Sequence, residues 1–309
     1  MKRKVNRVGT NTLTVSLPSK WARQFNIKPG DEIELVEIEN SIVINGSTRP
    51  HEKKEIIFNL DETKELLVRM LCAPYLKGYS TIKLYYSDPK YYKKVQKYIK
   101  YLVGFEIVEQ GKNFVKLEEI SAGSEEQFHP TLIRLFHILK SFLQEVHNYL
   151  QKPYENVQDI LDTEFSCDRL SLYCKRLLNK NQITGKAHET FAFYSIVTLI
   201  EMAGDELKEI IEYFVENNPK NYRYDKKLDP LFQGLEKVID ITIKKINNYT
   251  GKKDYNKQVV YALEQRNIRK TLKENRKSFL KNLDKDNIHI YWHLVNFSEH
   301  IQHMSQELF

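Results

Sequence analysis

Residues 130–150, PTLIRLFHILKSFLQEVHNYL, decide the fold class of the larger part of the chain. Apolar side chains recur there every three or four positions, as on one face of an amphipathic α-helix. This face consists of Leu132, Leu135, Phe136, Leu139, Phe142, Leu143, Val146 and Leu150. Similar patterns, separated by polar or Pro- and Gly-containing breaks, continue to the C-terminus and predict two similar three-helix bundles in tandem. We place the six helices at residues 130–150, 154–178, 185–216, 230–249, 253–283 and 288–308.

The region before these helices mixes strand and helix patterns. It predicts a small α/β sandwich whose helices lie on one face of the sheet. The expected elements are strand 55–59, helix 61–77, strand 81–86, helix 89–103 and a hairpin of strands 106–109 and 114–119.

The N-terminal region alternates polar and apolar residues in short strands, most clearly at residues 12–17. Pro18 begins a short helix at residues 19–25, and strands follow at residues 32–37 and 41–44. A unit of about 45 residues is too small to bury much core alone, so we expect it to dimerise. With polar linkers at 47–54 and 121–126, the predicted domains are 1–48, 54–121 and 125–309.

The positive charge of the chain is concentrated at one end. Residues 1–28 contain seven Lys and Arg residues and no carboxylate, whereas the remainder has 41 basic and 41 acidic side chains. This distribution excludes a uniformly basic nucleic-acid coat protein and indicates phosphate contacts by the N-terminal region, although a solvated basic tail is the simpler alternative for residues 2–4.

Composition excludes several other classes of protein. Hydrophobic residues make up 41% of the chain, which argues against global disorder. No apolar run is long enough to predict a membrane-spanning helix, and the basic N-terminus lacks the apolar core of a secretory signal. Three cysteines provide no disulfide framework, so we expect a cytoplasmic protein.

The N-terminal motifs resemble those of the SpoVT/AbrB family. The resemblance covers residues 3–46, where a basic strand, the Leu17-Pro18-Ser19-Lys20-Trp21 helix start and the Lys28-Pro-Gly-Asp31 turn occur in order. It implies a swapped-hairpin β-barrel homodimer that binds double-stranded DNA. The residues it assigns to DNA contact are Arg3, Lys4, Arg7, Lys20 and Arg23. In some relatives the same fold serves assembly alone.

Two carboxylate pairs are the main candidates for chemistry in the helical region. Glu164 and Asp168 lie four residues apart on the predicted second helix, and Glu201 and Asp205 have the same spacing on the third. Residues at i and i+4 share a helix face, so two antiparallel helices can direct both pairs at one cation. Oxygen ligands suit Mg²⁺, Mn²⁺ or iron best, and Zn²⁺ remains a candidate. A solvated helix face is the ordinary alternative for each pair alone.

Taken together, these pairs resemble the PhoU family, most closely in the run LIEMAGDEL at residues 199–207. The resemblance spans residues 125–309 and implies tandem three-helix bundles that bind metal clusters. The second bundle departs from the family pattern, because Ile268 follows Glu264 by four residues. On the last helix, metal binding and helix packing are both open for His293, Asn296, His300 and His303.

Two further basic stretches need no ligand to explain them. Lysines alternate with tyrosines at residues 90–101, as in some RNA-binding proteins. A second set of basic residues lies along the predicted fifth helix. The latter are Arg266, Arg269, Lys270, Lys273, Arg276 and Lys277. We interpret both as solvated faces.

The domain order as a whole resembles that of archaeal phosphate-uptake regulators of the PhoU family. It implies a cytoplasmic homodimer that reports phosphate status by contacting the ATPase of a phosphate ABC transporter and by binding DNA. Two alternatives are an adaptor whose N-terminal domain only dimerises and a metal-binding helical sensor. Because common nucleotide-binding, protease and hydrolase motifs are missing, we expect no enzymatic activity.

Overall fold

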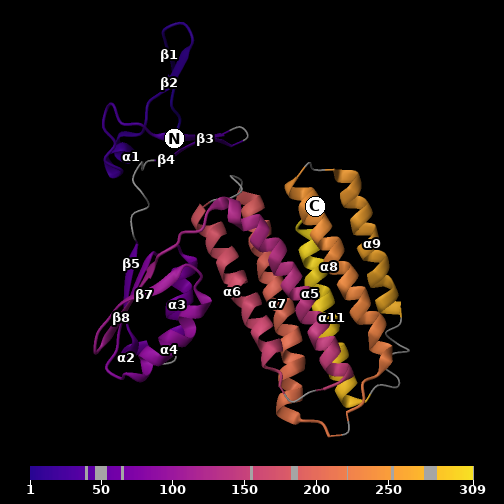
Figure 1. The fold of residues 1–309 in the computed structure, drawn as a ribbon. Helices are drawn as coiled ribbons and strands as arrows, with labels where there is room; N and C mark the ends of the chain where they lie inside the picture. The colour runs from indigo at the N-terminus through magenta and orange to yellow at the C-terminus, as the bar shows by residue number, and fades with distance from the viewer. Residues whose placement is uncertain are drawn as a thin grey trace. The chain divides into compact units, whose positions relative to one another are not determined.

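The computed structural model describes residues 1–38, 41–45, 54–63, 66–153, 156–181, 187–220, 222–251, 254–274 and 284–308. The chain divides into two compact units, Met1–Lys53 and Lys54–Phe309 (Figure 1). Helices account for most of the second unit, as the sequence predicts.

The first unit consists of two hairpins and one short helix. Strands β1 (Val5–Val8) and β2 (Thr12–Val15) are antiparallel, as are β3 (Glu34–Ile38) and β4 (Ser41–Asn45), and α1 (Ser19–Gln24) lies between the hairpins in sequence. Gly9 has a φ of 71° in the turn of the first hairpin, a conformation that glycine adopts without strain. β2, α1, β3 and β4 match the predicted elements at 12–17, 19–25, 32–37 and 41–44 to within two residues, while residues 47–53 of the predicted linker lie outside the described residues.

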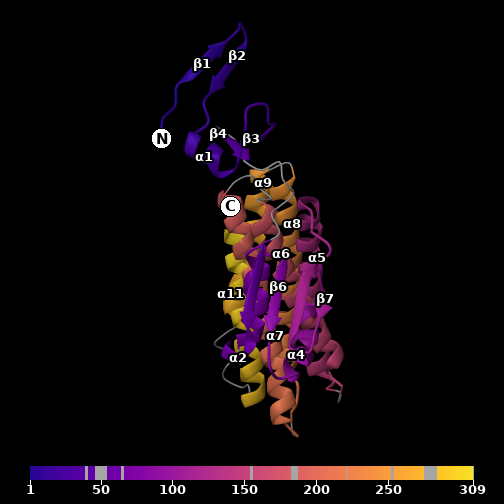
Figure 2. The same cartoon turned by 90° about the vertical axis from the view of Figure 1, so that its left-hand side faces the viewer.

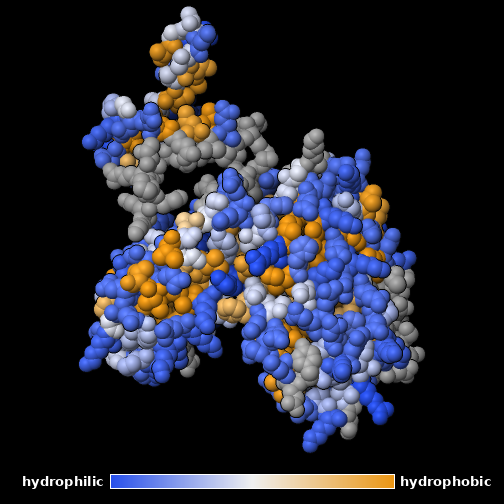
Figure 3. Space-filling model, in the orientation of Figure 1, coloured by the Kyte–Doolittle hydropathy of each residue, from blue (hydrophilic) through white to orange (hydrophobic). Residues whose placement is uncertain are grey.

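Among the residues of this unit whose side chains the structure describes, none is buried and none belongs to a hydrophobic core. Val5, Leu13 and Val15 are each more than half exposed, and Figure 3 shows apolar side chains along the first hairpin. Apolar strand faces of this kind need cover from another surface. The observation agrees with the predicted dimer, and the swapped-hairpin barrel remains a prediction.

The second unit begins with a four-stranded sheet. Its strands are β5 (Glu55–Asn59), β6 (Thr81–Tyr85), β7 (Phe105–Gln110) and β8 (Phe114–Glu119), in the order β5-β6-β8-β7. β5 and β6 are parallel and the other pairs antiparallel. The helices are α2 (Leu60–Thr63), α3 (Leu67–Leu76) and α4 (Lys90–Tyr98), followed by a 3₁₀ turn, η2 (Ile99–Tyr101). α3 and α4 cover one face of the sheet (Figure 1), as predicted.

One prediction in this region is wrong in detail. The sequence predicts a single helix over residues 61–77, but the structure has α2 and α3 as separate helices. Leu66, which precedes α3, has φ −91° and ψ 12°, outside the α-helical range, and this conformation interrupts the helix.

The helical region contains the six predicted long helices. They are α5 (Phe128–Gln151), α6 (Gln158–Asn181), α7 (Ala187–Asn217), α8 (Asp229–Thr250), α9 (Tyr255–Glu274) and α11 (Lys285–Gln306). The predicted starts at Tyr154, Gly185 and Lys253, and the predicted helical segment 275–283, lie outside the described residues.

The two sets of three helices are not independent. α7 packs along α11, and α5 packs against α8. One cluster of buried apolar residues includes Phe136 of α5, Ile210 of α7, Leu235 of α8 and Phe297 of α11. The helical region is therefore built around a shared core, and the division into two three-helix bundles stays a prediction.

The α/β part is attached to α6 by a buried arginine. The guanidinium of Arg176, which is 2% exposed, donates hydrogen bonds to the carbonyl oxygens of Tyr75 and Tyr79 and lies 2.9 Å from a carboxylate oxygen of Glu119. Lys180 approaches the same carboxylate at 2.6 Å. A buried charge with several partners fixes geometry, so α6 and the α/β part act as one body. Figure 2 shows the sheet in front of the helical region.

Candidate metal centre

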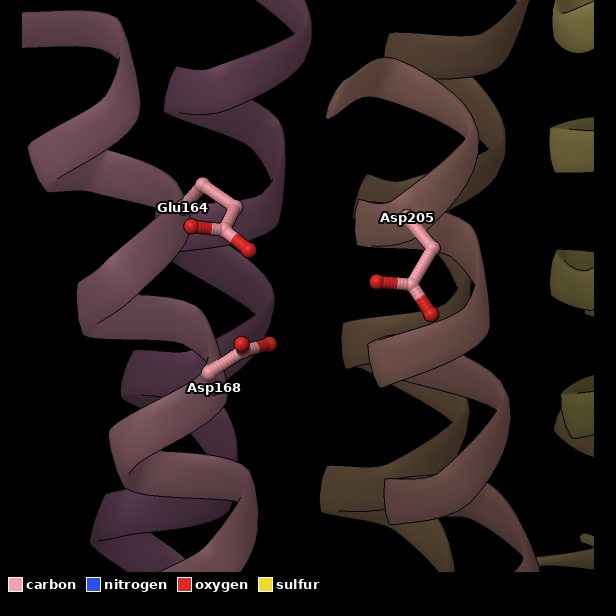
Figure 4. Close-up of side chains that lie close together, drawn as sticks. All are labelled: Glu164, Asp168 and Asp205. Atoms are coloured by element: carbon pink, nitrogen blue, oxygen red, sulfur yellow. The ribbon is translucent and has the colours of Figure 1, made fainter. Parts of the chain in front are cut away.

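Three carboxylates meet where α6 packs against α7. Glu164 and Asp168 belong to α6 and Asp205 to α7, and one ligand oxygen from each lies within 4.8 Å of the others. Figure 4 shows the side chains pointing into the space between the two helices. Glu164 is buried, Asp168 half-buried and Asp205 exposed, so the cluster extends from the helix seam to the surface. Hard oxygen donors in this arrangement fit a divalent cation.

The electrostatics of the cluster also favour a cation. Burial raises the pKa of Asp168 to about 8, and the charges of Glu164, Glu201 and Asp205 add to the effect. Partial desolvation raises the pKa of Asp205 too, with the charge of Glu201 as the next cause. Negative charge on the neighbouring carboxylates thus disfavours ionisation of Asp168 and Asp205. A bound cation would remove this repulsion.

One lysine already compensates part of the charge. Lys208 Nζ lies 2.7 Å from Glu164 Oε1 and lowers the pKa of Asp168. The sequence patterns did not single out this residue. Its position three residues after Asp205 places it on the same face of α7, which is the signal that could have identified it.

The fourth predicted ligand, Glu201, lies outside this group of three. Its carboxylate forms an ion pair with Lys175 of α6. The charge of Glu201 nevertheless acts on Asp168, so the two groups are electrostatic neighbours. The structure therefore brings three of the four predicted residues together, and the role of Glu201 stays a prediction.

Residues of the α/β part border the cluster. The ring of Tyr101, in η2, lies 4.6 Å from that of Phe165, the neighbour of Glu164 in α6. Burial raises the pKa of Tyr101, and Asp168 and Glu164 raise it further. Burial also raises the pKa of Cys72 in α3 to about 11, with added effects from Glu201 and Asp168. Sequence patterns could not reveal this proximity, because more than 60 residues separate the two regions.

Three of the four His and Asn residues singled out on α11 contact one glutamate, Glu206 of α7. His293 Nδ1 lies 2.7 Å from Glu206 Oε2, His300 Nε2 lies 3.6 Å from Glu206 Oε1, and Asn296 donates a hydrogen bond of 3.3 Å to Oε2. His303 is exposed. These contacts join α7 to α11 and favour the packing interpretation. The described residues contain no second group of three candidate metal ligands.

The predicted DNA contacts all belong to the first unit. Arg3 and Lys4 precede β1, Arg7 lies on β1 opposite Leu13, and Lys20 and Arg23 lie one turn apart on α1. All five are exposed, and none forms an ion pair with a described residue. The only polar contact described for these side chains is a 3.3 Å hydrogen bond from Arg23 Nε to the carbonyl of Ser19. These cations are available to an anionic partner.

One comparison with known proteins concerns the N-terminal part of the chain. Residues 7–55 match the family model described as "Antidote-toxin recognition MazE, bacterial antitoxin". The match supports an N-terminal AbrB-like domain, a type that commonly dimerises and binds DNA. No curated protein and no solved structure matches the chain. None of the described helices has the length and apolar character needed to cross a membrane.

Proposed function

We propose that this chain is a phosphate-responsive transcription regulator of the cytoplasm that binds double-stranded DNA as a homodimer. The AbrB-like unit binds DNA. The remainder of the chain reports phosphate status through contact with the ATPase of a phosphate ABC transporter, as the resemblance to archaeal PhoU-family regulators implies. No catalytic step is involved. A change of state in the helical region alters the dimeric N-terminal unit and hence its hold on an operator.

One observation carries the DNA-binding proposal: five exposed cations without acidic partners among the described residues lie in a unit whose family match supports an AbrB-like domain. Two-fold symmetry would double the number of cations facing a duplex. Arg3 and Lys4, which precede the first strand, are placed to contact phosphates, whereas Arg7, Lys20 and Arg23 are assigned to base edges.

The register of the first hairpin refines these roles. Arg7 is the cross-strand partner of Leu13, and Val5 is the partner of Val15, so Arg7 shares a face with three apolar residues. A second copy that covers this face would hold Arg7 at the edge of the dimer contact. Lys20 and Arg23 on α1 are free of this constraint.

The sensing role is supported by the acidic cluster and its rigid link to the α/β part. A Mg²⁺, Mn²⁺, iron or Zn²⁺ ion held by Glu164, Asp168 and Asp205 would neutralise the repulsion among them. Glu201 can join this set when it leaves Lys175. Because Arg176 fixes α6 to the α/β part, a shift of α6 on binding is transmitted there.

DNA binding is tested by selecting genomic fragments with the purified full-length protein, followed by gel-shift titration at several salt concentrations. We expect a specific site whose affinity falls steeply with salt. Replacing Lys20 and Arg23 with Gln should weaken binding to the specific site. Replacing Arg3 and Lys4 with Gln should lower the salt slope by about 0.9 for each phosphate that the variant no longer neutralises. An exposed cation of the second unit, replaced by Lys112→Gln, is the matched control. Absence of any shift at low salt contradicts the regulator and favours an adaptor that uses the unit only to dimerise.

A metal-sensing role is the second candidate, and the convergence of three carboxylates favours it. Protein purified without chelator should contain stoichiometric metal, which Glu164→Ala combined with Glu201→Ala should abolish. Retention of metal by this double variant would show that the ligand assignment is wrong. Asp168→Asn separately tests the half-buried member of the cluster.

A further inference from the structure

We infer that the helical region binds a small organic anion, a carboxylate or phosphate monoester with an apolar body, in a pocket between α8, α9 and α11. α8 packs against both α9 and α11 (Figure 1). The pocket belongs to the half of the helical region that lacks the acidic cluster. The inference goes beyond the proposed function and does not depend on it.

Two arginines give the pocket its charge. Arg266 and Arg269, one turn apart on α9, line it, and no acidic residue does among the described ones. Arg266 makes no ion pair with a described residue. Arg269 Nη2 lies 4.0 Å from Glu299, whose side chain is about half exposed, and a pair of that length at the surface compensates little charge. Within the described part of the chain, Arg269 Nε is shielded from solvent and has no hydrogen-bond partner. An anionic acceptor would satisfy it.

A buried polar network forms the inner wall. Gln265 and Ser305 line the pocket, and Ser305 Oγ donates a hydrogen bond to the side-chain oxygen of Gln265. Behind them, Lys245 is fully buried and donates a hydrogen bond of 2.7 Å to the carbonyl of Ser305. Gln265 also donates one of 2.8 Å to Thr242. These hydrogen bonds satisfy the buried groups, so the inner wall of the pocket is polar and held in one geometry.

Lys245 strengthens the preference for an anion. Burial lowers its pKa to about 8, so the ammonium is still mostly protonated at pH 7. Three basic side chains therefore lie at or behind the pocket. Arg266 is exposed and Arg269 half-buried, so solvent screens part of this charge, and the combined field favours an anion over a cation.

The size and walls of the pocket limit the ligand. Its volume is about 350 Å³. Since a water molecule occupies about 30 Å³ in the liquid, the pocket has room for roughly a dozen non-hydrogen atoms. A nucleotide is too large. Val238 from α8 and Ala262 from α9 supply apolar wall beside the charged groups, which suits an apolar body better than a bare inorganic ion.

Calorimetric titration of the full-length protein with benzoate, phenyl phosphate, inorganic phosphate and benzylamine tests the inference. We expect saturable binding of benzoate or phenyl phosphate, and whichever binds identifies the acidic group. Arg269→Gln should weaken this binding at least tenfold, because it removes a charge-assisted hydrogen bond. Ala262→Phe should do the same by filling the pocket without changing its charge. Arg134→Gln, on the exposed face of α5, is the control and should leave affinity unchanged.

Several results would overturn the inference. The inference is wrong if neither organic anion binds saturably, or if the cation benzylamine binds as tightly as the organic anions. It is also wrong if inorganic phosphate alone binds, or if both pocket variants keep the wild-type affinity. The two variants act by different means, one on charge and one on volume. If circular dichroism shows that one of them is misfolded, the other still decides the result.

Discussion

Replacing Asp168 with Asn should stabilise the metal-free protein. Burial and three neighbouring carboxylates raise the pKa of Asp168 to about 8, against 3.8 for the unperturbed group. At pH 7 the folded protein must therefore hold a proton on this group that the unfolded chain has released. Each pKa unit corresponds to about 1.4 kcal/mol, so the roughly three units between 3.8 and pH 7 set an upper limit of about 4 kcal/mol.

The expected gain is smaller than this limit, because Asp168 is only half-buried and solvent screens part of the repulsion. We expect the free energy of unfolding to rise by about 2 kcal/mol. For a unit as large as Lys54–Phe309 this raises the melting temperature by about 4–8 °C. The sign follows from proton uptake. The native state binds more protons than the unfolded state between about pH 4 and pH 8, so wild-type stability falls as the pH rises through that interval. The gap between variant and wild type should close near pH 4.

Thermal unfolding in the presence of a chelator, at pH 4, 7 and 8.5, measures this effect. Asp162→Asn is the matched control, since Asp162 is exposed on the same helix. Adding Mn²⁺ should reverse the order, because the wild type gains binding energy that Asp168→Asn loses in part. A variant that is no more stable than the wild type at pH 7 and 8.5 refutes the account of repulsion in the cluster.

Three further predictions concern other parts of the chain. Arg176→Met should lower the free energy of unfolding, measured by chemical denaturation, by about 3–5 kcal/mol, because Glu119 loses a partner at a buried site. An unchanged denaturation midpoint contradicts the attachment of the α/β part to α6. Leu13→Glu should convert a dimer to a monomer in light scattering, since it charges an exposed apolar strand face, while Thr14→Glu on the opposite face should not. Burial lowers the pKa of Lys245, so between about pH 8 and pH 10 the unfolded chain binds more protons than the folded one, and the free energy of unfolding should rise with pH there. Lys245→Met should flatten this part of the curve of unfolding free energy against pH. A curve identical to that of the wild type argues against a buried ammonium.

Local patterns in the sequence predicted the helices well. The apolar stripe at residues 130–150 became α5, and the helix ends predicted at residues 150 and 249 lie within one residue of the observed ends of α5 and α8. These signals are local, since a 3.6-residue period and a helix-breaking residue act within a few turns. The interruption at Leu66 was missed because residues 61–77 have a continuous helical pattern.

The candidate site was only partly predictable. The i and i+4 spacing predicted Glu164 and Asp168 on one helix and Asp205 on the next, and the structure brings these three carboxylates together. The pairing of Glu201 with Lys175 could not be foreseen, because a single lysine on a charged helix carries no signal. Contacts between helices distant in sequence depend on tertiary packing.

The roles of the His and Asn residues on α11 and of the arginines on α9 also depend on contacts between helices, which sequence patterns do not predict. Histidines at helical spacing suggest either metal binding or packing, and only the position of Glu206 on α7 separates the two. Arg266 and Arg269 were interpreted as a solvated face. The structure places them on the wall of a pocket, a location that depends on the side chains of α8 and α11.

The most direct test of the central claim is genome-wide footprinting of the protein in cells grown with and without phosphate. We expect protection at a small number of promoter sites, a change in occupancy between the two conditions, and loss of protection in a strain whose protein carries Lys20→Gln and Arg23→Gln. No protected site in either condition, with the protein present at normal abundance, would contradict a DNA-binding regulator. Protection that does not respond to phosphate would contradict the sensing role alone.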